Sequence, residues 1–286
     1  MREFSIVKND QDSPHNVVSR IGTIKNANGK LGLTYENIFS VFMKISLTNP
    51  KYAGWLIVIS LGFTTAAAEG ATPSFKDDMA QRTLACTACH GPEGRAAPDG
   101  YYPRLAGKPA GYLYNQLISF RDGKRHYALM KQLIAPLTDA YLLEMAQHFS
   151  RLDVPYPAPQ KTNASANALA RGQVLVLQGE PAQGIPACVQ CHGSAMTGVA
   201  PYVPGLLGLP RDYLNAQLGA WKTGKRRAHA PDCMKTVVAL LSDEDINAAS
   251  SYLAAQAPPA NTRPAASAPP LAAGQSAINC GSAPKP

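Results

Sequence analysis

The sequence predicts an all-α chain built from two tandem copies of one small helical module. One observation is a C-x-x-C-H-G hexapeptide that occurs twice, as CTACHG at 86–91 and as CVQCHG at 188–193. A second is that the residues after each copy match at a constant spacing. A third is that apolar residues recur at helical intervals, while no stretch alternates convincingly as a strand does. We therefore expect two helical domains joined by a linker.

The N-terminal part of the chain has the pattern of an export signal. An apolar run at 53–63, AGWLIVISLGF, follows Lys44 and Lys51 and precedes three alanines that end at Ala68. This order of basic region, apolar core and small residues is typical of a secretory signal peptide, and we expect cleavage near Ala68. The alternative is a membrane anchor, but a span needs about 20 apolar residues, more than this run provides.

A signal of this kind would begin at Met43, so residues 43–68 are interpreted as signal peptide and residues 1–42 as an over-extended gene start. The alternative for residues 1–42 is a cytoplasmic tail.

The remaining 218 residues (286 − 68) suffice for two domains of about 100 residues. They carry 20 Lys and Arg (27 − 7) against 15 Asp and Glu (19 − 4). No basic stripe is interleaved with aromatic residues, so we expect no nucleic-acid binding, and the small excess favours docking to an acidic protein.

All six cysteines lie in the part predicted to be exported, where thiols oxidise unless something else holds them. A C-x-x-C pair serves in redox disulfides, in zinc sites and in covalent haem attachment. The adjacent His90 and His192 favour haem attachment, because two thiols bond the vinyl groups while the imidazole reaches the iron. A zinc site does not require a histidine at the same place twice, and a thioredoxin-like motif would need a βαβ pattern.

The residues that follow the two hexapeptides align as an internal duplication. PRLAGKPAGYLYNQLISFRDGKR from Pro103 corresponds to PGLLGLPRDYLNAQLGAWKTGKR from Pro204, at an offset of 101 (204 − 103). The offset then becomes 104, which aligns Met130 with Met234 (234 − 130). The two halves are therefore copies of one module.

Helical periodicity predicts the elements of each module in order. A helix is expected before each hexapeptide, at 75–84 and at 169–177. The apolar residues of 112–120 share one helical stripe, as do Leu142, Met145 and Phe149. In the second module, Ser-Asp-Glu-Asp at 242–245 is typical of a capped helix start.

The segments between and after these elements set the domain boundaries. Pro, Ala and Ser dominate 154–167, which we interpret as the linker, with a first domain at 69–158 and a second at 168–256. Residues 257–286 form a Pro/Ala-rich tail without an apolar face.

Together these features resemble the class I c-type cytochromes, and among them the tandem di-haem proteins of the cytochrome c4 type. The resemblance covers about residues 75–256 and rests on the paired CxxCHG, P-x-L-x-G, Y-L-x-x-Q-L, G-K-R and a downstream Met in each half. That family consists of exported electron carriers whose small helical domains each surround one haem. The resemblance implies two covalently bound haem c groups.

The resemblance also implies roles for individual residues. The thioether anchors would be Cys86, Cys89, Cys188 and Cys191. The iron ligands would be His90 with Met130 and His192 with Met234. The backbone carbonyls of Pro103 and Pro204 would accept the second ring proton of the proximal histidines, although a proline that merely ends a loop is an equally good reading of either one alone.

Other residues compete for the distal position. His126 and His229 each lie a few residues before a candidate methionine, but they do not align with each other, since His126 corresponds to Arg227. Met196 lies only four residues after His192 and cannot reach the opposite haem face. Arg125 and Arg226 are candidates for pairing with haem propionates, with a solvated charge run as the alternative.

Two cysteines, Cys233 and Cys280, belong to neither hexapeptide. Unclaimed thiols in an oxidising compartment tend to pair, so we predict a disulfide that fastens the tail over the Met234 loop. Two independent thiols are the alternative.

An iron with two protein ligands has no open position for a substrate, so it exchanges electrons but does not readily bind oxygen or peroxide. We expect a periplasmic electron carrier and not an enzyme. Its donor would be a quinol-oxidising complex or a dehydrogenase, its acceptor a terminal oxidase, and peripheral membrane association is compatible with the sequence. Three alternatives stay open: a cytochrome subunit of a dehydrogenase complex, a di-haem peroxidase and a metal-binding structural module.

Overall fold

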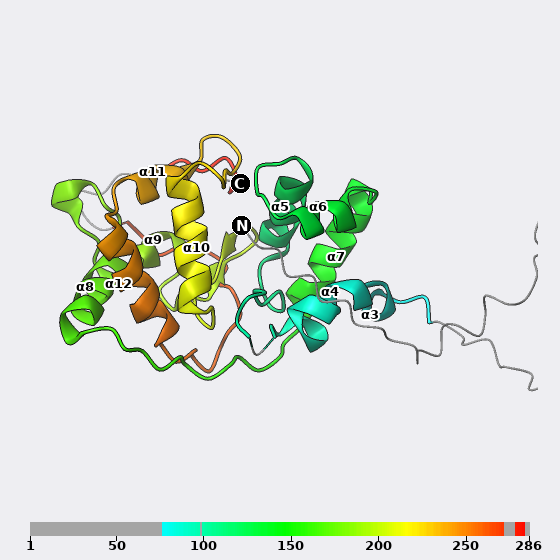
Figure 1. Cartoon of the computed structure of the whole chain (residues 1–286), viewed down its shortest axis with the longest axis horizontal. Coiled ribbons are helices and arrows are strands. Elements are labelled where there is room, and N and C mark those ends of the chain that lie inside the picture. The colour runs from blue at the N-terminus through cyan, green and yellow to red at the C-terminus, as the bar shows by residue number, and fades with distance from the viewer. Residues whose placement is uncertain (1–75, 98, 272–277, 284–286) are drawn as a thin grey trace, which may run out of the picture. The chain divides into compact units, whose positions relative to one another are not determined.

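The computed structural model describes residues 76–97, 99–271 and 278–283, and the chain from Ser74 to Pro286 forms one compact unit. The predicted gene start and signal peptide, residues 1–68, lie outside the described residues. The described part is mainly helical, as expected, and its helices fall into two consecutive groups (Figure 1). Within these ranges, none of the helices combines the length and the hydrophobicity that crossing a bilayer requires.

The first group of helices packs around α5 (Ala110–Arg121), which contacts α6 (Ala128–Ile134) and α7 (Asp139–Arg151). Two shorter helices precede them, α3 (Met79–Arg82) and α4 (Leu84–His90), followed by one 3₁₀ turn, η3 (Pro92–Gly94). The predicted stripe of α7 is buried at Leu142, Met145 and Phe149.

The helix predicted at 75–84 is wrong in its extent. Phe75 lies outside the described residues, and α3 ends at Arg82 because the hydroxyl of Thr83 donates back to the Met79 carbonyl, 2.7 Å away. A new helix, α4, then starts at Leu84 and carries the whole first CxxCH unit.

The second group repeats this plan with α8 (Ala166–Leu177), α9 (Cys188–His192), α10 (Arg211–Lys222), α11 (Cys233–Ala239) and α12 (Asp243–Ala254). A 3₁₀ turn, η4 (Pro181–Gln183), precedes α9. Helix α8 starts three residues before the predicted position, since the Ser165 hydroxyl accepts the Ala168 N–H. The predicted start of α12 is a capping box between Ser242 and Asp245.

The second group also contains two short strands, although no strand was expected. β1 (Gly198–Val199) pairs antiparallel with β2 (Val203–Pro204), and Ala265 of the tail lies parallel beside Val199. The Ala200 N–H donates to the Ala265 carbonyl at 2.8 Å, and the Ala265 N–H donates to the Gly198 carbonyl at 2.9 Å. Two-residue strands are too short to show an alternating pattern, which explains why the sequence did not reveal them.

The linker lies against the protein. Arg104 donates to the Pro155 carbonyl at 2.8 Å and to the Val154 carbonyl, and its guanidinium lies 4.0 Å from the centre of the Tyr156 ring. Further along, the Gln160 N–H donates to the Ala254 carbonyl at 2.9 Å. The segment between α7 and α8 is therefore held at both of its ends.

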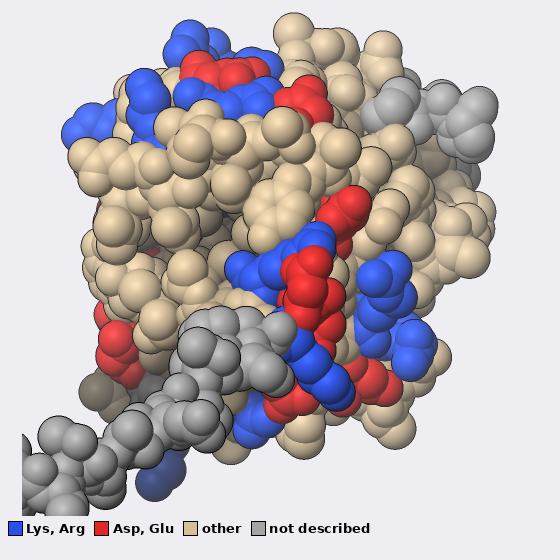
Figure 2. Space-filling model, turned by 90° about the vertical axis from the view of Figure 1, so that its right-hand side faces the viewer, with Lys and Arg blue, Asp and Glu red and all other residues tan. Residues whose placement is uncertain are grey.

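Charged side chains of both signs alternate on the face that Figure 2 shows. Ion pairs of the first group such as Arg82–Asp77 and Arg121–Asp139, at 2.7 and 2.6 Å, illustrate this mixing. Exposed pairs of this kind contribute roughly 0–1 kcal/mol. This face therefore carries no single-sign field that would select an acidic partner.

Candidate functional site

Both CxxCH units line one cavity of about 840 Å³ between the two groups of helices. This volume lies in the upper part of the roughly 300–1,000 Å³ range of small-molecule sites, and the walls are mainly apolar. Every site residue that the sequence predicted contributes to its lining: Cys86, Cys89, His90, Pro103, Met130, Cys188, Cys191, His192, Pro204, Cys233, Met234 and Cys280.

The two histidines are oriented in the same way. His90 ends α4, is 6% exposed and places its Nδ1 2.8 Å from the Pro103 carbonyl oxygen; His192 ends α9, is 8% exposed and places its Nδ1 2.7 Å from that of Pro204. A carbonyl only accepts, so Nδ1 carries the proton and Nε2 keeps its lone pair. Burial lowers the pKa of both rings, which favours the neutral form that a metal requires.

The first cysteine of each CxxCH unit, Cys86 or Cys188, is half-buried against an apolar cluster. Burial raises the pKa of Cys86 and of Cys188 to about 11 and also raises that of Cys191. Such surroundings disfavour a thiolate and suit an uncharged thioether sulfur. Among the residues that the structure describes, no three His, Cys, Asp or Glu side chains gather as a metal site, so the zinc alternative has no support here.

The two candidate methionines occupy equivalent short helices, Met130 in α6 and Met234 in α11, and both are half-buried at the cavity. Asp232 caps α11, since its carboxylate accepts the Lys235 N–H at 3.1 Å and the Ala228 N–H at 2.7 Å. Met196 is instead buried in the core of the second group, with 4% of its surface exposed. The two methionines predicted as ligands therefore lie at the cavity, whereas Met196, which the sequence excluded, lies in the core.

The rival histidines differ in their surroundings. His126 is exposed and also contributes to the cavity, so its position does not exclude it. The His229 Nδ1 lies 3.4 Å from the Lys124 Nζ, and the backbone N–H of His229 donates to the Ser282 hydroxyl at 3.1 Å. The first contact directs the His229 ring toward Lys124 in the other group of helices.

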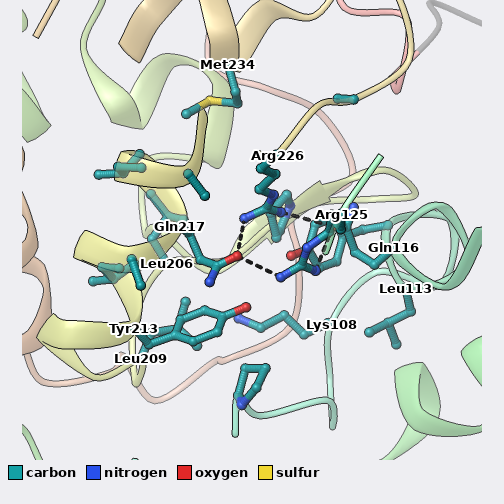
Figure 3. Close-up of a pocket in the computed structure, with 18 of the residues that line it drawn as sticks. Lys108, Leu113, Gln116, Arg125, Leu206, Leu209, Tyr213, Gln217, Arg226 and Met234 are labelled. Carbon is teal, nitrogen blue, oxygen red and sulfur yellow. Dashed lines mark hydrogen bonds between the residues drawn. The ribbon is translucent and has the colours of Figure 1, made fainter. Parts of the chain in front are cut away.

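Sequence reasoning named Arg125 and Arg226 as candidates for pairing with haem propionates, but it missed the symmetric cluster that they form with two glutamines at the boundary between the groups (Figure 3). The Gln116 side-chain oxygen accepts from both Arg125 and Arg226, each at 2.9 Å. The Gln217 oxygen likewise accepts from Arg226 at 2.8 Å and from Arg125 at 2.7 Å. Both pairs of equivalent residues differ by 101 in number (217 − 116 and 226 − 125), so each module meets its own copy about a pseudo-twofold axis.

This Arg/Gln cluster contains no carboxylate. Arg125 lies over Phe120 and Arg226 over Trp221, at 4.3 and 3.7 Å from the ring centres. Burial is the main reason that the pKa of Arg226 falls to about 10, and the nearby Arg125 adds to it, so the side chain still carries its charge at neutral pH. The cluster therefore places positive charge in the cavity wall, where it suits a ligand with acidic groups. The sequence signal for the Arg/Gln cluster was the glutamine and the G-K-R that recur in both copies.

A family model described as Cytochrome c matches residues 169–257. The chain is 41% identical over 172 residues to the thiosulfate dehydrogenase electron acceptor of Thiomonas intermedia, covering 60% of this chain and 78% of that protein. It is 34% identical over 177 residues to the cytochrome c4 of Pseudomonas aeruginosa, covering 60% and 84%.

Two solved structures have similar folds. Reduced recombinant cytochrome c4 from Pseudomonas stutzeri matches with a TM-score of 0.53 and 29% identity, over 62% of this chain and 96% of that one. The thiosulfate dehydrogenase TsdBA from Marichromatium purpuratum matches with a TM-score of 0.54 and 31% identity, over 59% of this chain but only 36% of that longer one. The duplicated helical modules, the shared cavity and these relatives agree: the chain belongs to the di-haem cytochromes of the c4 type, all-α class I electron carriers that are not enzymes and that hold two covalently bound haem c groups.

Proposed function

We propose that this cytochrome accepts electrons from a dehydrogenase of a small sulfur oxyanion, with thiosulfate as the first substrate to test, and passes them to an acceptor such as a terminal oxidase. The observation that carries the proposal is the 41% identity to a thiosulfate dehydrogenase electron acceptor. A second protein of the same description, from Stutzerimonas stutzeri, is 33% identical over 195 residues and is covered to 89% of its length. Of the two donors that the sequence left open, these relatives favour the dehydrogenase over the quinol-oxidising complex.

In this proposal each CxxCH unit holds one haem. Cys86 and Cys89, and likewise Cys188 and Cys191, form the thioether bonds. His90 and Met130 hold the first iron, and His192 and Met234 the second. The bound haems supply two one-electron couples, whose potentials a thioether ligand raises relative to a second imidazole. The Pro103 and Pro204 carbonyls orient the proximal rings, and the apolar cavity walls exclude water from the iron.

The shared cavity supports electron exchange within the molecule. Both CxxCH units line it, so the two sites open into one space. The Arg/Gln cluster has four hydrogen bonds, of which two cross between the halves, from Arg226 to Gln116 and from Arg125 to Gln217, and these help to hold the halves together. An electron received at one haem is therefore expected to reach the other without a change in the fold.

The proposal places this function in the periplasm. The signal-like segment at 53–63 supports export, and the Cys233–Cys280 disulfide suits an oxidising compartment. Fusion of the complete N-terminal region to a reporter enzyme that is active only after export tests this directly. Activity should depend on residues 43–68 and persist when residues 1–42 are removed.

The donor is tested with purified proteins. The oxidised cytochrome is mixed with a thiosulfate dehydrogenase and thiosulfate, and haem reduction is followed by absorbance. We expect rapid reduction that requires both the dehydrogenase and thiosulfate, and a slower rate with a mono-haem cytochrome c of similar potential as control. Reduction by a quinol-oxidising complex, together with no reduction by the dehydrogenase, would contradict the proposal and favour the other donor.

A further inference from the structure

Lys108 is a buried cation that extends from one half of the protein into the other. It lies just before α5 in the first half, yet its Nζ donates to the backbone carbonyl of Gly205 in the second half at 2.7 Å. The residue is 4% exposed and contributes to the wall of the shared cavity (Figure 3). Its charge is therefore held inside the protein, close to where a cofactor is bound.

No acidic side chain balances this charge in the part of the chain that the structure describes, where every ion pair involves other residues. Burial, with a smaller contribution from the like charge of Arg104, lowers the pKa of Lys108 to about 7. A buried charge without an opposite partner destabilises a fold. The polypeptide alone therefore gains little from a lysine at this position.

The position is not repeated in the second module. Lys108 aligns with Leu209 (108 + 101), which is 7% exposed in the apolar core of the second half. Arg125 and Arg226, in contrast, occupy equivalent positions in the two modules. Lys108 is thus a charge that breaks the pseudo-twofold symmetry of the cavity.

The charge acts on the second site. Gly205 directly follows Pro204, whose carbonyl accepts the Nδ1 proton of His192 at 2.7 Å. The positive charge of Lys108 is one of the causes that lower the pKa of His192, whereas for His90 the corresponding cation is Arg125. Reduction adds an electron to the haem, so a fixed positive charge in surroundings of low dielectric constant stabilises the reduced state.

We propose that Lys108 of the first half raises the reduction potential of the haem attached to the second half, as a positioning residue that acts by its charge through the Gly205 contact. The proposal concerns this chain's own potentials and holds for any electron donor. It predicts that substitution of Lys108 changes the reduction potential of the second haem more than that of the first, although the two haems have equivalent ligands.

The test is a redox titration of the holoprotein followed by proton NMR. Haem methyl signals, assigned through contacts with Cys188 and Cys191 or with Cys86 and Cys89, report the oxidation of each haem separately. Lys108→Met removes the charge, and Lys108→Gln removes it while keeping a donor for the Gly205 carbonyl. At pH 6, both variants should shift the second haem toward the oxidised state on the order of tenfold, ~59 mV for one electron.

Controls separate charge from structure. Lys108→Arg should keep the wild-type potential, and Lys161→Met, which removes an exposed linker charge, should change neither haem. Unchanged potentials in both neutral variants, an equal shift of the two haems, or a wild-type value in Lys108→Gln alone would each overturn the proposal. If Lys108→Met does not fold, the potential of the second haem is compared between Lys108→Gln and Lys108→Arg. The proposal requires a lower potential in Lys108→Gln.

Discussion

His90 and His192 reach the same hydrogen-bonded state through different local structures. The first ends a seven-residue helix and the second a five-residue helix, and their carbonyl partners lie 13 and 12 residues further along the chain. In each case the ring is buried, neutral and oriented by one backbone acceptor. The polypeptide's own contacts therefore hold both rings in the neutral, oriented state that a metal ligand requires.

Replacing either candidate distal ligand should affect one haem only. Met130→Ala or Met234→Ala should remove about half of the sulfur-to-iron charge-transfer band of the oxidised protein and lower one potential, since a thioether favours ferrous iron. Visible spectroscopy and potentiometry check this. Met196→Ala is the matched control, because Met196 lies in the core and should change stability without affecting the band. An unaltered spectrum in both ligand variants would show that the distal assignments are wrong.

Lys108 should also make stability depend on pH. Its pKa is about 7 in the folded protein against an ordinary value of 10.5, so the unfolded chain binds more protons between these values. The free energy of unfolding should therefore rise with pH across this window. Lys108→Met should flatten the rise and stabilise the protein at pH 7 by on the order of 2–4 kcal/mol. Denaturant unfolding at pH 7 and 9 measures this, and an equal slope in wild type and variant would contradict it.

At the scale of elements, the described parts of the Pro/Ala-rich tail contact three separate segments of the fold. Residues near Ala265 lie beside β1, and the Thr197 hydroxyl donates to the Arg263 carbonyl at 3.0 Å. Cys280 is joined to Cys233 at the start of α11, the pair proposed from the sequence. Ser282 then accepts a hydrogen bond from Asn115 of α5 at 3.0 Å through its carbonyl. The tail thus connects β1, α11 and α5.

Opening this disulfide should weaken the second haem site. Thiol titration of the denatured, unreduced holoprotein should find no free thiols, since four cysteines carry haem and two are bonded to each other. Cys280→Ser should lower the free energy of unfolding by about 2–4 kcal/mol, because a closed loop of 47 residues restricts the unfolded chain. It should also loosen the Met234 ligand, seen as a weaker charge-transfer band, while the first haem keeps its spectrum. Two free thiols in the wild-type protein would contradict the bridge.

The sequence predicted those features that repeat or that have a local period. Helices α5, α7, α8 and α12 follow from apolar stripes and caps, and the cavity residues follow from the duplicated hexapeptide and its flanks. The break at Thr83 depends on one back-bonded hydroxyl. The bridge between Val199 and Ala265 joins residues that are remote in sequence, and Lys108 appears as an ordinary charge until Gly205 is placed beside it. These features depend on contacts between distant residues or on single hydrogen bonds, so they became visible only in the structure.

At the scale of the whole molecule, duplication produces an interface in which a module recognises its own copy. The Arg125 and Arg226 backbones pair antiparallel, and the Arg227 N–H donates to the Lys124 carbonyl at 2.7 Å. The Arg/Gln cluster repeats this symmetry with side chains. A duplicated gene product can form such an interface without new sequence, because each patch is complementary to itself.

Pseudo-twofold symmetry predicts equal effects from equivalent substitutions in the cluster. Gln116→Leu and Gln217→Leu each remove one acceptor shared by two arginines and should each lower the free energy of unfolding by about 1.5–3 kcal/mol, the range for hydrogen bonds to charged groups. Denaturant unfolding of the two single variants makes the comparison. Gln147→Leu, on the exposed surface of α7, serves as control. A clear loss in only one of the cluster variants would show that the interface is not symmetric in energy.

The disulfide of the tail also constrains the order in which the protein matures. Two kinds of cysteine chemistry must be completed in one chain: four thiols must stay reduced until they react with haem, while two must be oxidised. Cys280 is the last of the six cysteines along the chain, so it is the last to emerge from a chain that is made and exported from its N-terminus. Until it arrives, Cys233 has no partner other than the CxxCH thiols, so haem attachment that precedes completion of the tail removes every wrong partner. Sequence order alone thus favours a pathway in which haem is bound first and the tail is closed last.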